Sequence, residues 1–137
     1  MKIIGIQIKS KEAVLVVLEK DANDNISQTE ESAKFKIDDP SDAGQVRQFR
    51  DQINSAFDSI GADRIGVIAR MAKGGGKLAA SPISFKLEGI MQLYEKTEIE
   101  LIWKQTTNAY FKKNPKPDSA NHNYQQDAYN LATYMIR

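Results

Sequence analysis

Apolar runs and short polar turns alternate through the N-terminal part of the chain. Residues 3–8 and 13–18 are apolar and rich in β-branched side chains, and the polar residues 9–12 separate them, a pattern typical of a β-hairpin. After the Asp- and Asn-rich turn at 21–25, apolar residues alternate with lysine over 33–37, the two-residue period of a half-buried strand. The pattern predicts three consecutive antiparallel strands.

Beyond Pro40 the spacing of apolar residues changes to that of a helix. Ser41 is the expected N-cap of this helix, and Gly61 is the expected residue at its C-terminal end. The side chains between them recur every three or four residues, so they predict one apolar stripe facing the core. The stripe consists of Val46, Phe49, Ile53, Phe57 and Ile60.

Strands and helices alternate in the remainder. The apolar run 65–68 predicts a strand buried on both faces, and 98–103 predicts a further strand. Three helices are expected, at 83–94, at 106–113 and at 124–135.

This order predicts an α/β fold over residues 1–137, which we expect to form a single domain. The expected sheet is five-stranded and mixed, an antiparallel meander followed by βαβ units, with helices on both faces. The aromatic residues Tyr94 and Trp103 are expected in the core.

Composition excludes several classes of function. The chain has no cysteine, which excludes disulfides, thiolate zinc sites and cysteine nucleophiles. The net charge of +1 gives no broad basic surface, so any nucleic-acid site must be local. The sequence shows neither a signal peptide nor an apolar run long enough to span a membrane, so we expect a cytoplasmic protein.

Two stretches carry a resemblance to a known family. Residues 64–111 resemble the middle of RuvC-type Holliday-junction resolvases, including the helix start Ser-Pro-Ile-Ser-Phe-Lys-Leu at 81–87. Residues 126–132, Gln-Asp-Ala-Tyr-Asn-Leu-Ala, resemble the last catalytic helix of RuvC-like nucleases. The chain is also similar to a small bacterial family of RuvC-like proteins of unknown function. The resemblance implies the ribonuclease-H-like fold.

The resemblance further implies three places for metal-binding acids: the first strand, the end of the fourth strand and the last helix. These places hold Gln7, Ala69 and Asp127. Tyr124 stands three residues before Asp127, where active relatives have an acid or histidine, and His122 stands five before. Two-metal hydrolysis needs about three or four carboxylates, so Asp127 alone predicts a degenerate site. Whether Gln7 and Ala69 are natural or introduced stays open.

Candidate binding residues flank the expected site. Lys73 and Lys77 enclose a Gly-rich loop, with Arg70 just before it, that could offer positive charge and backbone N–H groups to a phosphate, or could be a plain surface loop. Lys112 and Lys113 follow two aromatic residues, a mixture found on strand-tracking surfaces and also in solvated loops.

Three functions remain open. The first is a nucleic-acid- or protein-binding module that needs no cofactor. The alternative is a Mg²⁺- or Mn²⁺-dependent endonuclease on branched or structured DNA, with Asp127 as the catalytic metal ligand. The third is a structural or regulatory protein, such as a homodimer formed through the second helix.

Overall fold

The computed structural model describes residues 1–71 and 81–137, and it confirms the α/β architecture. Within these residues, one mixed sheet has the strand order β3-β2-β1-β5-β6. β4 pairs with the same edge of β2 as β3 does, at the opposite end of β2. β1 pairs antiparallel with β2 and parallel with β5, which in turn pairs parallel with β6. The six strands are β1 (Lys2–Lys9), β2 (Glu12–Lys20), β3 (Ile26–Gln28), β4 (Ala33–Lys36), β5 (Arg64–Ile68) and β6 (Ile99–Ile102).

The sheet has one strand more than the sequence pattern indicates. The additional strand is β3, whose three residues extend the antiparallel edge where Ser27 lies opposite Glu19. Three residues are too few to establish an alternating pattern, so periodicity could not identify this strand.

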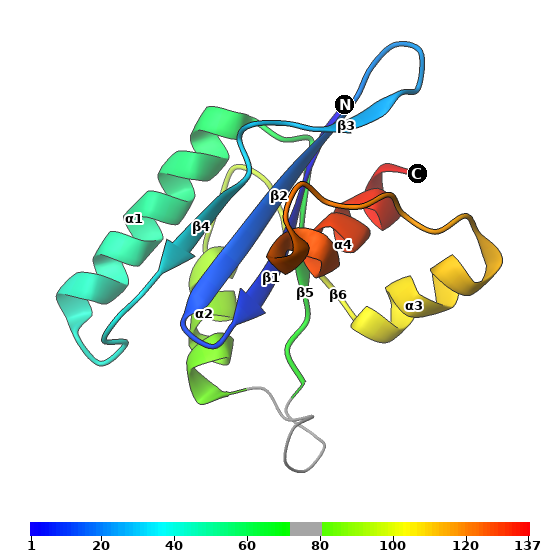
Figure 1. The fold of residues 1–137 in the computed structure, drawn as a ribbon. Coiled ribbons are helices and arrows are strands. Elements are labelled where there is room, and N and C mark those ends of the chain that lie inside the picture. Colours follow the sequence, from blue (N-terminus) through cyan, green and yellow to red (C-terminus); the bar gives the residue numbers. More distant parts are fainter. Residues whose placement is uncertain (72–80) are drawn as a thin grey trace.

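Helices cover both faces of the sheet, with α1 and α2 on one face and α4 on the other (Figure 1). The described helices are α1 (Ala43–Ile60), α2 (Pro82–Gln92), α3 (Lys104–Lys113) and α4 (Gln126–Ile136), and the short 3-10 helix η2 (Asn123–Gln125) precedes α4. No helix within residues 1–71 and 81–137 has the length and apolar character needed to cross a membrane.

The N-cap of α1 lies one residue later than the sequence indicates. The Asp42 carboxylate accepts the backbone N–H of Gly44 at 3.1 Å. Ser41 instead donates its hydroxyl to Asp39 at 2.6 Å. Both residue types are good caps, and only the chain direction at the turn decides between them.

β1 and β5 lie between two cores. On one face, Ile4 and Ile6 of β1 pack with Phe49 and Phe57 of α1 and with Leu87 of α2. On the opposite face, the alternate residues of β1 meet α4. Two buried faces explain why these strands read as apolar runs rather than as alternating patterns.

α4 lies directly against the sheet because glycine leaves room for its backbone. A Cβ placed on Gly5 would lie 2.3 Å from the carbonyl oxygen of Ala128. One placed on Gly66 would lie 2.3 Å from the sulfur of Met135. This close contact sets the position of α4 along β1, and with it the position of Asp127.

The two aromatic residues expected in the core, Tyr94 and Trp103, differ in burial. Tyr94 is half-buried and packs edge-to-face on Phe57, with ring centroids 4.9 Å apart. For Trp103 the prediction is wrong, because its side chain is 51% exposed. Trp103 follows the edge strand β6, whose residue Leu101 is also exposed, and no further strand of the described chain covers it.

Candidate functional site

Gln7 and Asp127 meet where β1 approaches the start of α4. Gln7 lies two residues after Gly5 and therefore on the same face of β1. Asp127 precedes Ala128, the α4 residue that contacts Gly5. The side-chain amide of Gln7 donates from Nε2 to Oδ2 of Asp127 at 2.8 Å, across 120 positions of sequence.

Lys104 is a second donor to the same carboxylate oxygen. It is the first residue of α3, and its Nζ lies 3.1 Å from Oδ2 of Asp127. A positive side chain therefore already neutralises the Asp127 charge. Sequence reasoning missed Lys104, because no spacing rule links residues of two different helices separated by a long connector.

The amide oxygen of Gln7 is left without a partner. Oε1 is buried and accepts no hydrogen bond from any described residue. The amide cannot simply turn over, because Oε1 would then face the carboxylate oxygen of Asp127 at hydrogen-bonding distance. An orphaned buried oxygen is uncommon, and it marks this point as different from ordinary core.

Ala69 stands just beyond β5, the strand next to β1. Its N–H donates to the carbonyl of Ile102 at 2.9 Å, so its backbone continues the pairing with β6. Its methyl group is buried at 7% exposure and offers no ligand.

A carboxylate does lie at the end of β5, but it comes from α2. Glu88 is buried and accepts the backbone N–H of Arg70 at 2.8 Å. Burial lowers the pKa of the Arg70 guanidinium, and the negative charge of Glu88 opposes that shift. Nε of Arg70 has no partner among the described residues. α2 covers the face opposite to α4, so Glu88 and Asp127 belong to different layers.

These donors do not fit a two-metal centre. No group of three or more Asp, Glu or His side chains converges anywhere in residues 1–71 and 81–137. The remaining stretch, 72–80, contains none of these residue types in its sequence. The acid Glu12, on β2, lies opposite Lys9 and Lys36 rather than beside Asp127. One carboxylate with a bound lysine is too little negative charge for two divalent ions.

Lysines and an imidazole gather around Tyr124, three residues before Asp127. Lys9 donates from Nζ to the carbonyl of Tyr124 at 3.2 Å. Lys34 of β4 places Nζ 4.4 Å from the centroid of the Tyr124 ring. His122 stacks on the same ring, with centroids 5.6 Å apart and an interplanar angle of 8°.

The other candidate lysines lie elsewhere. Lys112 and Lys113 are exposed in the last turn of α3. Lys112 and Phe111 line a hollow of about 530 Å³ together with Gln126, the residue before Asp127. Lys73 and Lys77 lie outside the described residues, whereas Arg70 lies within them.

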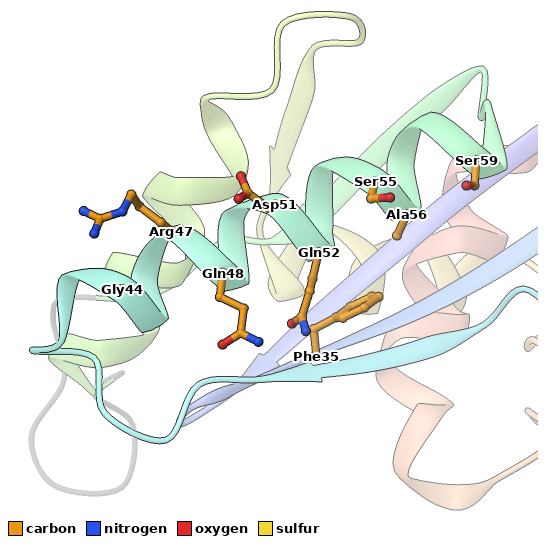
Figure 2. A pocket seen from close by; sticks show the side chains of 9 residues that line it. All are labelled: Phe35, Gly44, Arg47, Gln48, Asp51, Gln52, Ser55, Ala56 and Ser59. Carbon is orange, nitrogen blue, oxygen red and sulfur yellow. The ribbon is translucent and has the colours of Figure 1, made fainter.

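A further hollow, of about 710 Å³, lies between α1 and β4 (Figure 2). Its walls are the polar side of α1, where Gln48 and Gln52 reach toward Phe35 of β4. α1 is on the face opposite to α4, so this hollow is separate from Asp127. Its only ionisable lining residues are Arg47 and Asp51, and we assign no chemistry to it.

Similarity to known proteins identifies the family of this chain. A family model described as "Protein of unknown function (DUF3010)" matches residues 1–135. The chain belongs to this family. No curated protein matches the DUF3010 chain.

Several of the solved structures similar to this DUF3010 protein are Holliday-junction resolvases. Thermus thermophilus RuvC has a TM-score of 0.74 at 10% identity, covering 99% of this chain and 94% of its own. The same protein in complex with Holliday junction substrate gives 0.69, at the same identity and coverage. The yeast mitochondrial resolvase Ydc2 gives 0.59 at 10% identity, covering 98% of this chain and 75% of its own. The chain therefore has the ribonuclease-H-like fold of RuvC, as its sequence resemblance implies.

Proposed function

We propose that this DUF3010 protein is a nucleic-acid-binding module that has kept the RuvC architecture without its metal-dependent hydrolysis. One observation carries the proposal. Oδ2 of Asp127, the one acid at the three positions implied by the resemblance, already accepts the Gln7 amide at 2.8 Å and the Lys104 ammonium at 3.1 Å.

Charge balance argues against an efficient two-metal centre. A divalent ion placed about 4 Å from the Lys104 ammonium meets a repulsion on the order of 8 kcal/mol at an effective dielectric constant of 20. Lys104 is 53% exposed and can turn away from the ion, so this repulsion alone does not decide the matter. The lack of carboxylates is the stronger argument. With Gln7 and Ala69 at two of the three implied positions, Asp127 is the one anionic ligand there for two metal ions.

Positive charge near this position suits a polyanion instead. Lys104 contacts Asp127, Lys9 and Lys34 contact Tyr124 three residues before it, and all three lysines are exposed. Arg70 lies just beyond the end of β5, the strand next to β1. Lysines at an exposed surface bind phosphates mainly through counterion release, which requires no metal. The Holliday junction bound by the T. thermophilus RuvC neighbour supports DNA as the ligand class.

The test measures cleavage and binding together. Single-stranded, duplex and four-way DNA are offered to the unmodified chain and to Gln7→Asp/Ala69→Glu, each with Mg²⁺ and with Mn²⁺. We expect the unmodified chain to bind without cleaving, and cleavage to appear only in the double variant. Because Ala69 is buried, thermal melting of the double variant checks that it remains folded.

Matched lysine variants locate the binding surface. Lys34→Ala should weaken DNA binding, because Lys34 is an exposed cation that lies over the Tyr124 ring, three residues before Asp127. Lys96→Ala is the control, since Lys96 pairs with Asp58 of α1 on the opposite face. Cleavage by the unmodified chain that disappears in Asp127→Ala would establish the endonuclease instead. Absence of DNA binding even at low salt would favour a structural or regulatory role.

A further inference from the structure

We propose that Tyr124, with His122 stacked on it, is a platform on which an unpaired nucleobase stacks, so that the ligand is single-stranded or branched nucleic acid. This inference rests on the proposed function. It goes further by naming which feature of the nucleic acid is recognised and which side chain recognises it.

The platform is held beside Asp127 by the backbone. Tyr124 lies in η2, three residues before Asp127, and η2 leads directly into α4. The Lys9 ammonium binds its carbonyl at 3.2 Å and so ties η2 to the end of β1. Lys34 lies opposite Val14, which lies opposite Gln7. Two strand spacings, about 10 Å, therefore separate the Lys34 backbone from that of Gln7.

The Tyr124 ring is not part of the core. It is 38% exposed, whereas Tyr129, five residues later on α4, is 6% exposed. Its neighbours are a lysine ammonium and an imidazole, and both residues are themselves exposed. Two parallel rings with the Lys34 ammonium beside them offer π-stacking for a base and charge for its phosphate.

A base can compete with Lys34 for the ring. A cation–π contact at an exposed site is worth about 0.5–1 kcal/mol. Stacking of one base on an aromatic side chain is worth about 1–3 kcal/mol. The base therefore takes the ring in preference to Lys34, and the released ammonium stays beside the ring, where it can contact a phosphate. Bases of intact duplex stack on each other and present no free face, so the platform favours unpaired bases.

Two substitutions at one position separate the ring from its hydroxyl. Binding of an oligothymidylate of about 20 nucleotides and of a duplex of similar length is measured by fluorescence anisotropy. Tyr124→Leu removes the ring and should weaken oligothymidylate binding by about fivefold to 150-fold, the stacking contribution of one base. Duplex binding should change by less than about twofold. Tyr124→Phe keeps the ring and should bind both ligands as the unmodified chain does.

The outcomes separate this inference from the proposed function. If Lys34→Ala weakens binding to both ligands but Tyr124→Leu leaves oligothymidylate binding unchanged, the platform is wrong and the binding module stands. An equal loss for both ligands in Tyr124→Leu also contradicts stacking of an unpaired base. If the unmodified chain binds neither of these ligands nor four-way DNA, both proposals fail. Equal melting temperatures of the Phe and Leu variants exclude unfolding as the cause of a difference.

Discussion

Replacement of Gly5 by alanine tests how the sheet positions the candidate site. A Cβ at this position would lie 2.3 Å from the carbonyl oxygen of Ala128, and 2.8 and 2.9 Å from N and Cβ of Ala132. These are backbone atoms and a Cβ, so no side-chain rotation can relieve the clash. β1 cannot retreat either, because β2 and β5 hold it on both sides.

The cost follows from the distance that α4 must move. An ordinary contact begins at about 3.4 Å, so the gap at the Ala128 oxygen must widen by 3.4 − 2.3, or about 1.1 Å. Overpacking of a filled core costs about 1–3 kcal/mol. A shift forced on a whole helix belongs at the upper end of that range. About 3 kcal/mol corresponds to a fall in melting temperature of roughly 10 °C for a domain of this length.

Gly89→Ala is the matched control. Gly89 lies inside α2, and a Cβ there would have no atom of residues 1–71 or 81–137 within 4 Å. Alanine in a helix interior is about 0.5–1 kcal/mol more favourable than glycine, so this variant should melt a few degrees higher. Both variants are compared by differential scanning calorimetry and by urea unfolding. The same methyl group is thus expected to act in opposite directions at the two positions.

One result would refute the reasoning. If Gly5→Ala melts within about 2 °C of the unmodified chain, α4 does not contact β1 as closely as described. The expected shift should also separate Asp127 from Gln7, because Asp127 adjoins Ala128. DNA binding should then weaken in Gly5→Ala and remain unchanged in Gly89→Ala.

Three further predictions concern titration, an ion pair and salt. Burial and the Asp58 carboxylate raise the pKa of Tyr94 to about 12, so its stabilising contribution should be complete below pH 10 and lost between pH 10 and 12. The ionisation step of Tyr94 near pH 12 should be missing from the absorbance titration of Tyr94→Phe, and an unchanged titration curve would contradict this. Arg64 donates twice to the Glu100 carboxylate and once to a carbonyl of α4. Arg64→Lys keeps the charge but loses this geometry, so it should lower the free energy of unfolding by about 1 kcal/mol in urea, and an unchanged midpoint would contradict this. Lys9→Ala should lower the slope of log Kd against log salt by about 0.7–0.9 if Lys9 contacts a phosphate, and an equal slope would exclude that contact.

Most of the fold could be predicted from the sequence, because local periodicity and turn residues carry that information. The stripe ending at Ile60 predicts α1, and Gly61 ends it in the left-handed conformation with φ 61°. The run 3–8 predicts a strand and the run 65–68 a strand buried on both faces, and the structure confirms both strands and places Ile65 and Ile68 in opposite cores. The resemblance around Asp127 identified α4 as the helix that meets β1.

The candidate site could be predicted only in part. The resemblance selected Gln7 and Asp127, and the two side chains are indeed in contact. Nothing in the sequence indicated Lys104 as the third member, the exposed Trp103, or the contact of Lys34 with Tyr124.

The sequence by itself determined which segments are strands and helices and which of their faces are apolar. The tertiary structure alone decided which polar side chains meet, because those contacts join residues from 23 to 120 positions apart. Their geometry depends on how closely α4 packs on Gly5 and on where α3 begins after the edge strand β6. Sequence periodicity describes each element separately and contains no information on the distance between two of them.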